Sequence, residues 1–547
     1  MKKIAFAFAA IIAAVSFASC KPEDKPSFVE EVTVSPSNLT FSAEGETKTF
    51  TVKSNVAWKV SGESYMTFST KGEAASDVAV TVAVTIGKND SGAKREGTIL
   101  VTVPSGNNPT IKIDQEVFIA PPGLYNAADL NDFAAALTEE TPDLSKWTDP
   151  TSGEIIIYED IDASALDCFP IEPLPETAVI NGNGKTVTIA LSGATEQYLA
   201  MFKSIKGTVK NLTLSGTVKV DGVCPHNSHY AALAGTAIGS TIENVRNLVS
   251  IQVKSSNPET SAIHIGGLVG KASLGLTMSG CSNEGEISFT STGPSYHFAG
   301  ALVGAYGSAE DTGTVSIQNC SNSGSITLES GDVASWNYVA GLVGNIQGAT
   351  RGTHSGDAEW PVVLKDCTNA GIIALKGPAK TRAGGVFGRF NTDALIEGCS
   401  FTGKIQLNAC ELERNVGGIT SFIEKTCILL VKNCIFDGTI TMENGQKKAS
   451  YIGGISSSGA HASTVFDGCK TTKNSYVGCS LLGNIGMVTA QGSSALTVKN
   501  SKIAGTINAG GEETVITAEN FASWMYLGKN SAKSLSVDGG GNVFNNE

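Results

Sequence analysis

The pattern of apolar and polar residues predicts short β-strands along most of the chain. From about Val32 to Val117, apolar and polar residues alternate in runs such as Phe50-Thr51-Val52 and Ile111-Lys112-Ile113, separated by Gly, Asn and Ser. A period of two residues is typical of strands that bury one face. We therefore expect a small immunoglobulin-like β-sandwich at 32–118.

One segment has the spacing of a helix instead. It follows Pro121-Pro122-Gly123, which marks a domain boundary. Leu130, Phe133, Ala134 and Leu137 fall on one helical face, and Asn126 or Asp129 can cap the start. We interpret 119–155 as a linker and a short helical cap that shields the next strands from edge pairing.

The rest of the chain, about 156–510, is built from repeats. A four-residue block recurs at intervals of 32 to 47 residues, and an element like Gly266-Gly267-Leu268-Val269-Gly270 lies between successive blocks. A third short strand, such as Gly324–Leu328, follows each block. Three strands per repeat predict a parallel β-helix, which we take as right-handed, with coils about 4.8 Å apart. Residues 511–547 are then a C-terminal cap.

Cysteine closes most of these blocks. Six cysteines occupy a position that holds Leu212, Val245 or Ser501 in other repeats, and they are Cys281, Cys320, Cys367, Cys399, Cys434 and Cys469. Interchange with Leu and Val favours a buried ladder of free thiols over disulfides, because a free cysteine behaves as a small apolar residue. Metal binding is disfavoured, since the spacing is one cysteine per coil with no C-x-x-C and no neighbouring His. We predict no metal and no cofactor.

The first residues predict export. Met1-Lys2-Lys3 is followed by an apolar run, Ile4 to Phe17, that is too short to cross a bilayer, so 1–19 is interpreted as a signal peptide. Phe17-Ala18-Ser19-Cys20 resembles a lipobox, with Phe17 where Leu is usual. The resemblance implies an acylated Cys20, followed by a tether at 20–31. The alternative is a secreted protein cleaved before an incidental Cys20.

The residues after Cys20 predict where the protein is located. In the lipoproteins that this leader resembles, acidic residues such as Glu23-Asp24 after the cysteine are associated with the outer face of the outer membrane. We therefore expect a lipid anchor through Cys20 in the outer membrane, facing the cell exterior.

The formal net charge is −13 and Lys and Arg do not cluster, so nucleic acid is excluded as a partner.

The amino-terminal sandwich resembles the BACON domain, a module of Bacteroidetes surface proteins. The residues that carry the likeness are Ser37–Phe41, Ser54-Asn55 with Trp58, Arg95–Ile99 and Ile113-Asp114-Gln115. The family name implies carbohydrate binding, although such modules also act as spacers. Trp58 is either a sugar platform or a core residue, and its place in the run Val56–Val60 favours the core.

The repeats resemble the GLUG repeats of bacterial surface proteins, over about residues 124–510. Asp160-Ile161-Asp162 and Ile180–Val187 resemble the opening rung of that family. Such repeats occur in adhesins, in binding proteins and beside enzymes, so the resemblance implies a fold more than a function.

The sequence contains only fragments of a catalytic site. Asn391-Thr392-Asp393 copies the first motif of the polygalacturonase-like hydrolases, but the Asp-Asp, Gly-His-Gly and Arg-Ile-Lys that they also need are absent from the sequence. We interpret it as a turn. Lys380, Arg382 and Arg414 lie on consecutive coils and could bind a uronate, but no carboxylate cluster for calcium accompanies them. We predict no catalytic residues.

A candidate binding strip lies three residues before the second glycine of each repeat. There stand His264, Phe298, Tyr338, Arg382, Asn415 and Tyr451, and Tyr296, Trp336 and Lys380 lie two positions earlier. The next residue of each repeat is apolar or small, so alternation turns the strip outward. Aromatic and basic groups suit the binding of a polysaccharide or host glycan. The alternative is that the loops inserted before the glycines cover the strip. The function we expect is adhesion or glycan binding; the rivals are a polysaccharide lyase or glycoside hydrolase with an unrecognised site, and a purely structural cell-surface component.

Overall fold

The computed structural model describes residues 28–193, 195–258, 260–332, 334–408, 412–424, 426–443, 450–458, 463–480, 484–490, 496–525 and 539–546. The chain forms two compact units that divide between Pro121 and Pro122. The predicted signal peptide, Cys20 and most of the predicted tether lie outside the described residues.

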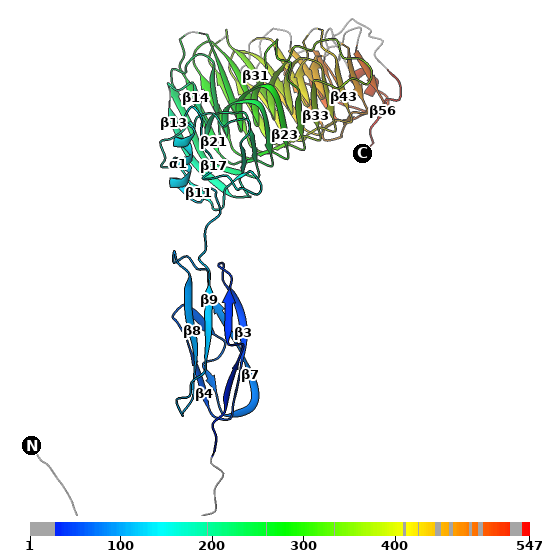
Figure 1. Ribbon diagram of the computed structural model, residues 1–547. Coiled ribbons are helices and arrows are strands. Elements are labelled where there is room, and N and C mark those ends of the chain that lie inside the picture. The colour runs from blue at the N-terminus through cyan, green and yellow to red at the C-terminus, as the bar shows by residue number, and fades with distance from the viewer. Residues whose placement is uncertain are drawn as a thin grey trace, which may run out of the picture. The chain divides into compact units, whose positions relative to one another are not determined.

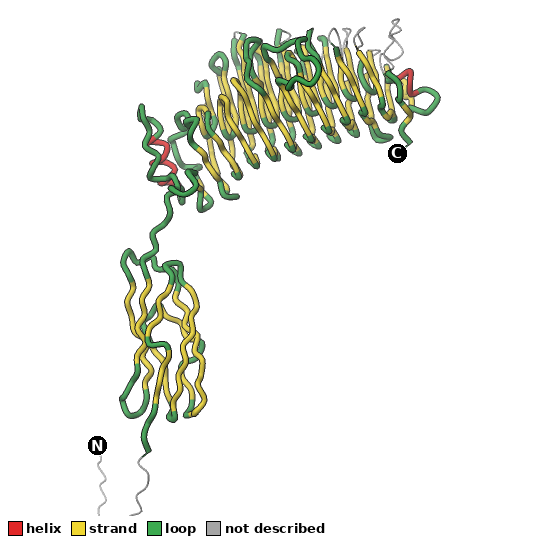
Figure 2. The backbone as a smooth tube through the Cα atoms, turned by 45° about the vertical axis from the view of Figure 1, so that its right-hand side comes forward, coloured by secondary structure: helices red, strands yellow, loops and turns green. Residues whose placement is uncertain are grey.

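The first unit consists of two sheets on one core (Figure 2). The apolar residues of the alternating runs are buried, as the sequence predicts: the shared core contains Phe50, Val52, Ile111 and Ile113. One sheet has the order β1 (Val32–Ser35), β3 (Glu46–Ser54), β7 (Ser76–Ile86), β5 (Met66–Phe68). The other has the order β2 (Asn38–Phe41), β9 (Thr110–Gln115), β8 (Arg95–Thr102), β4 (Trp58–Ser61), β6 (Gly72–Glu73).

Trp58 belongs to this core. It begins β4 and is 3% exposed, among the buried residues of both sheets. A ring covered in this way offers no face to a sugar, so Trp58 stabilises the unit by burial of apolar surface.

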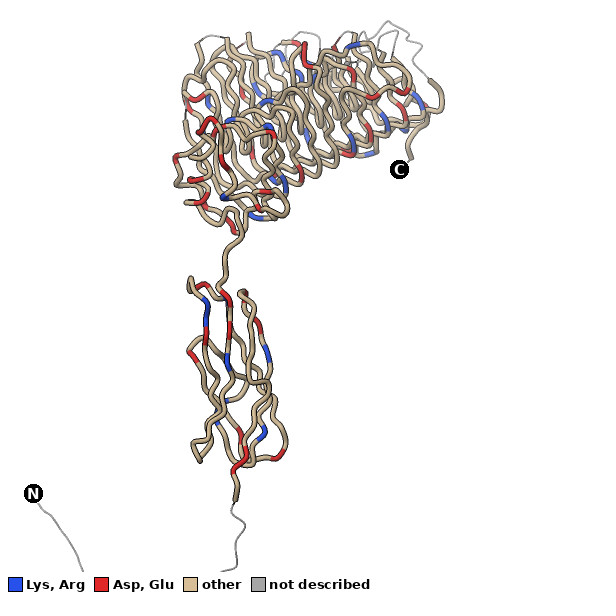
Figure 3. Tube along the Cα trace, in the orientation of Figure 1, with Lys and Arg blue, Asp and Glu red and all other residues tan. Residues whose placement is uncertain are grey.

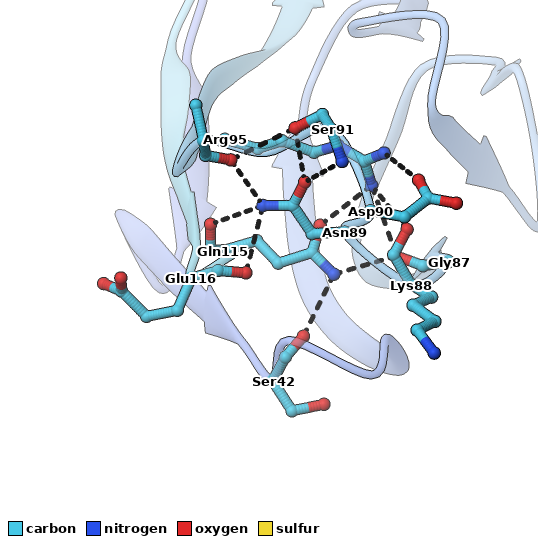
Figure 4. A network of polar contacts seen from close by, with 10 residues as sticks. Ser42, Gly87, Lys88, Asn89, Asp90, Ser91, Arg95, Gln115 and Glu116 are labelled. Atoms are coloured by element: carbon cyan, nitrogen blue, oxygen red, sulfur yellow. Dashed lines mark hydrogen bonds and ion pairs between the residues drawn. The ribbon is translucent and has the colours of Figure 1, made fainter. Parts of the chain in front are cut away.

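The buried amides of Asn89 and Gln115 lie in a network of hydrogen bonds in the first unit (Figure 4). The Asn89 amide nitrogen donates to three backbone carbonyls, and Gln115 Nε2 donates to the carbonyls of Ser42 (3.0 Å) and Gly87 (2.8 Å). Arg95 Nη1 donates to Gln115 Oε1 at 3.2 Å. Buried amides are costly unless they are hydrogen-bonded. Arg95 and Gln115 therefore tie β8 and β9 to the loops after β2 and β7.

The second unit begins with α1 (Ala127–Ala136). Asn126 caps it, because its side-chain oxygen accepts from the backbone N–H groups of Ala128 (2.9 Å) and Asp129 (3.0 Å). Leu130 and Phe133 are buried in one core with the strands that follow, and α1 lies beside β11 and β13 (Figure 1). The helix covers the start of that core.

The strands of the second unit form three long sheets in which equivalent strands of successive repeats pair in parallel (Figure 1). The nine-stranded sheet runs β14 (Tyr198–Leu199), β18 (Ser228–Ala231), β22 (Ser261–Gly266), β26 (Ser295–Gly300), β31 (Trp336–Ala340), β36 (Lys380–Gly384), β41 (Arg414–Gly417), β46 (Ser450–Gly453), β51 (Asn484–Gly486).

The seventeen-stranded sheet runs β10 (Ile155–Ile156), β12 (Val179–Asn181), β15 (Phe202–Ile205), β16 (Thr208–Lys210), β19 (Ala234–Glu243), β23 (Val269–Ser279), β27 (Val303–Tyr306), β28 (Val315–Gln318), β32 (Val343–Gln347), β33 (Val362–Lys365), β37 (Phe387–Asn391), β38 (Ala394–Glu397), β42 (Thr420–Phe422), β43 (Leu429–Lys432), β47 (Ser456–Ser458), β48 (Thr464–Asp467), β52 (Leu496–Lys499).

The twenty-one-stranded sheet is parallel except where β54 meets β55. It runs β11 (Ile161–Asp162), β13 (Thr186–Gly193), β17 (Thr213–Gly222), β20 (Arg246–Asn247), β21 (Ser250–Ser255), β24 (Ser282–Asn283), β25 (Ile287–Ser291), β29 (Ser321–Asn322), β30 (Ile326–Ser330), β34 (Thr368–Asn369), β35 (Ile372–Lys376), β39 (Ser400–Phe401), β40 (Lys404–Asn408), β44 (Ile435–Phe436), β45 (Thr439–Glu443), β49 (Lys470–Thr471), β50 (Tyr476–Cys479), β53 (Lys502–Ile503), β54 (Thr506–Ala509), β55 (Glu512–Val515), β56 (Val543–Phe544).

The six cysteines of the repeats lie in the core between the seventeen- and twenty-one-stranded sheets. All are at most 1% exposed, and the cysteines of the described residues are free thiols. Cys367 Sγ lies 3.2 Å from the Lys365 carbonyl oxygen, and burial raises the pKa of the Cys469 thiol to about 12. A neutral, buried thiol is chemically inert. The redox state of the ladder in the exported protein stays a prediction.

The residue before each cysteine turns the chain in the left-handed conformation. Asn319 has φ 53°, Asp366 has φ 52° and Asn433 has φ 53°, while Gly280 and Gly398 have φ 62° and φ 65°. Gly, Asn and Asp are the residues that tolerate this conformation. Gly, Asn and Asp therefore replace one another at this position of the repeats.

A second buried ladder lies two residues after the cysteines, and sequence analysis missed it. Asn247 donates to Asn283 (2.7 Å), Asn283 to Asn322 (2.8 Å) and Asn322 to Asn369 (2.8 Å), side chain to side chain. Each amide supplies the donor and the acceptor that its neighbours need, so four buried amides are satisfied together. The repeated Cys-x-Asn spacing carried the signal.

The end of the second unit contains a short helix and a last parallel strand. β56 (Val543–Phe544) pairs in parallel with β53, so parallel pairing continues beyond residue 510 into the segment predicted as a cap. The short helix α2 (Phe521–Trp524) precedes it, and the carbonyl of Trp524 accepts from Met487 N at 2.7 Å. The backbone that directly follows β51, the last strand of the nine-stranded sheet, is thus paired with the end of α2.

Candidate functional site

The predicted strip lies on the outer face of the nine-stranded sheet. The pairing register places its six residues in one ladder, and the ladder begins earlier than predicted, at Tyr198 and His229. The following residues, such as Ile265 and Val339, belong to the core, so the strip points away from it. The members are Tyr198, His229, His264, Phe298, Tyr338, Arg382, Asn415 and Tyr451, which we call the strip.

Exposure along the strip is uneven. His264, Tyr338, Arg382 and Asn415 are buried by their neighbours. Phe298, Trp336, Lys380 and Tyr451 are half-buried, and Tyr296 is 41% exposed. Solvent therefore reaches the strip chiefly around Tyr296, Trp336 and Phe298.

The rings of the strip pack on one another. His264 stacks on Phe298 with ring centroids 4.7 Å apart, and Phe298 stacks on Tyr338 at 5.0 Å. Trp336 lies parallel to Tyr338 at 6.0 Å, and Lys380 Nζ lies 4.5 Å from the Trp336 ring centroid. Most ring faces are thus used within the stack, and the stack presents ring edges and a cation outward.

Tyr296 is the exception. Its ladder neighbour in the preceding repeat is Ala262, whose single methyl cannot cover a ring, whereas its neighbour in the next repeat is Trp336. The exposure of Tyr296 agrees with an uncovered ring surface on the side of Ala262.

A second ladder faces the strip across the corner between two sheets. Its members stand seven positions after the strip residue of the same repeat, on the seventeen-stranded sheet, and His229 Nδ1 lies 2.9 Å from Thr236 Oγ1 across the corner. They are Thr236, Lys271, Ala305, Asn345, Arg389 and Phe422. Sequence analysis missed this ladder, although the constant spacing across each glycine element was visible. We call the two ladders together, with Tyr296, Trp336 and Lys380, the corner surface.

One carboxylate organises the charged part of the corner surface. Glu424 Oε1 accepts from Arg382 Nη1 at 2.7 Å and from Arg389 Nε at 2.8 Å. Burial acts to raise the pKa of Glu424, but the charges and hydrogen bonds of Arg389 and Arg382 outweigh it, so the pKa is lowered. Arg382 also lies 3.9 Å from the Phe422 ring centroid and 5.0 Å from that of Trp336. These contacts hold the Arg382 side chain in place within the corner surface.

The three cations considered for a uronate are not brought together. Arg414 pairs in register with Thr381, not with Lys380 or Arg382, so its side chain leaves the strand on the other face. It is fully buried, with Nη1 3.6 Å from Met442 Sδ. That expectation is corrected: only Lys380 and Arg382 belong to the corner surface.

The hydrolase-like motif has a structural role. Thr392 and Asp393 lie between β37 and β38, and the buried Asp393 carboxylate accepts from the backbone N–H groups of Gly352, Thr353, His354 and Ile428 at 2.7 to 3.1 Å. A carboxylate so occupied holds the long insertion after β32 against the sheet. Within the described ranges, no three His, Cys, Asp or Glu side chains are grouped as a metal site.

Charge is dispersed over both units, with Lys and Arg interspersed among Asp and Glu (Figure 3). In the part of the chain that the structure describes, no helix has the length and apolar character needed to cross a bilayer.

Comparisons with known proteins give no family. No family model matches the chain, and no curated protein matches it. A provisionally named immunoglobulin A1 protease from Bacteroides ovatus is 14% identical over 77% of this chain and 84% of its own, with a TM-score of 0.30. A protein from Bacteroides thetaiotaomicron is 17% identical over 19% of this chain and all of its own, with a TM-score of 0.13.

A third likeness is to a Bacteroides ovatus GH5 xyloglucanase in complex with a XXXG heptasaccharide. It is 18% identical over 24% of this chain, with a TM-score of 0.15, and the match spans only 37% of the xyloglucanase chain. Identities and TM-scores this low support no statement about activity.

Proposed function

We propose that this chain is a non-catalytic surface lipoprotein that binds a polysaccharide or host glycan at the corner surface. In this proposal acylated Cys20 anchors the chain in the outer membrane, facing the cell exterior. The single observation that carries the binding role is the solvent-reached part of the corner surface, where Tyr296, Trp336 and Phe298 adjoin Lys380.

The proposed architecture has two parts. The first unit is an immunoglobulin-like, BACON-like sandwich acting as a spacer, in support of which two sheets share one core with Trp58 inside. The second unit is a right-handed parallel β-helix of GLUG-like repeats, supported by the parallel pairing of equivalent strands in three sheets.

The chemistry of the exposed patch favours a glycan over a protein partner. Sugar-binding surfaces combine aromatic groups with a few polar groups. The repeats also set Tyr296 and Trp336 about 4.8 Å apart along the sheet, close to the length of one sugar ring. A chain of sugars lying along the corner surface meets one repeat per ring.

The test is a glycan array probed with the full mature chain. Binding to one glycan class, competed by the same glycan free in solution, is the expected result. An array with no signal from a folded protein would leave the surface without this role and favour a purely structural component.

A further inference from the structure

A pocket of about 390 Å³ opens at one end of the corner surface. His229 lines it from the nine-stranded sheet, and Thr236, Lys271 and Ser273 line it from the seventeen-stranded sheet. Asp311, on the loop between β27 and β28, completes it. The pocket therefore lies where the strip and the facing ladder begin.

Lys271 is the unusual group in this pocket. Its side chain is half-buried, and among the described residues no acceptor lies within hydrogen-bond or ion-pair distance of its amine. Burial lowers the pKa of Lys271, and Asp311 offsets only part of this. A half-buried ammonium without an acceptor is unfavourable, which is the condition that a bound anion relieves.

The neighbouring charges do not satisfy Lys271. The Asp311 carboxylate accepts from Leu274 N (2.8 Å), Tyr306 Oη (3.0 Å) and Gly313 N (2.9 Å), so three donors already hold it. At the rim, Lys203 is paired with Glu172 at 3.4 Å.

His229 adds no charge either. Burial and the charge of Lys271 lower the pKa of His229 to about 3, so the ring is neutral near pH 7. The amine of Lys271 is therefore the cation of this pocket that lacks a counter-charge among the described residues.

We infer that the pocket is an anion subsite, in which Lys271 Nζ binds the carboxylate or sulfate of an acidic glycan that lies along the corner surface. This rests on the proposed glycan binding and names its class of ligand. Gly307 and Asp311 of the pocket belong to the same repeat as Phe298 and Tyr296. A glycan held by its anionic group at Lys271 therefore places its next sugars beside Tyr296 and Trp336.

The test uses the full mature chain and three oligosaccharides of equal length, one built on uronic acids, one sulfated and one neutral. Lys271→Gln removes the charge and keeps a polar side chain. Lys219→Gln, an exposed lysine on β17, is the matched control. The wild type is expected to bind one acidic oligosaccharide at least tenfold more tightly than the neutral one. Lys271→Gln should lose that tenfold and retain the neutral affinity.

Two results would overturn the inference. If wild type and Lys271→Gln bind acidic and neutral oligosaccharides alike, the anion subsite is wrong while glycan binding stands. If no oligosaccharide binds, the proposed glycan binding is wrong, and inorganic sulfate then tests the anion subsite by itself. Millimolar sulfate should raise the Tm of the wild type more than that of Lys271→Gln, against chloride of equal ionic strength. Equal shifts would show that Lys271 holds no anion.

Discussion

Arg382 Nη1 lies 2.7 Å from Glu424 Oε1, and this contact joins the nine-stranded sheet to the segment that follows β42. Both side chains are mostly withdrawn from solvent, at 10% and 25% exposure. A pair in such a place contributes little when intact but leaves an uncompensated charge when one partner is removed.

Glu424→Gln should destabilise the second unit by roughly 2 to 4 kcal/mol, because Arg382 and Arg389 both lose their counter-charge. The free energy of unfolding from denaturant titration measures this. The control is Glu329→Gln, which breaks the exposed pair with Lys376 and should cost less than about 1 kcal/mol.

The same pair predicts a pH dependence. The pKa of Glu424 is lower in the folded chain than its ordinary value of 4.5, so the unfolded chain binds the proton more readily. The stability that Glu424 contributes is present above pH 4.5 and is lost as the pH falls through the folded pKa. The difference in unfolding free energy between wild type and Glu424→Gln should shrink over that range. A constant difference down to pH 3 would contradict the assignment.

The cysteine ladder predicts inert thiols. Ser501, at the equivalent ladder position, donates its hydroxyl to the Lys499 carbonyl two residues earlier at 2.9 Å. Cys367 Sγ lies near the equivalent carbonyl, so Cys367→Ser should cost only about 1 kcal/mol. In the native protein the six thiols should resist alkylation and react after denaturation. Peptide masses showing any two of them joined in a disulfide would reject the prediction.

Asp393→Ala should release the insertion after β32, because four backbone N–H groups lose their acceptor. We expect faster hydrogen exchange at 349–358 and a loss of about 2 to 4 kcal/mol. Asp357→Ala, in the exposed part of the same insertion, is the control and should change neither. Unaltered exchange in Asp393→Ala would mean that other contacts hold the insertion.

The lipid anchor predicts that wild-type chain takes up labelled palmitate and that Cys20→Ala does not. The variant should be released from the membrane fraction or remain as precursor. Palmitate in Cys20→Ala at the wild-type level would place the lipid on another residue.

Sequence patterns predicted the strands, the cysteine ladder and the strip, because local rules set them. Period-two alternation placed Phe50 and Val52 in the first core, and the repeat spacing placed Cys320 in the second. The register of parallel strands then stacks equivalent positions, so the strip itself was predictable.

The surroundings of the strip were not predictable from its own sequence segment. Arg382 is buried because Phe422 and Glu424, about 40 residues later in the chain, cover it. Lys271 lies in a pocket because a loop of the next repeat brings Asp311 to it. Such contacts depend on where insertions fold back, and alternation carries no information about that.

The most direct test of glycan binding at the corner surface is calorimetric titration of the glycan found on the array into wild type, Tyr296→Ala/Trp336→Ala and Tyr476→Ala. Tyr476 is a half-buried tyrosine of the twenty-one-stranded sheet, away from the corner surface. We predict that the double variant remains folded but binds at least tenfold more weakly, and that Tyr476→Ala binds like wild type. Equal affinity for all three proteins would contradict the proposal.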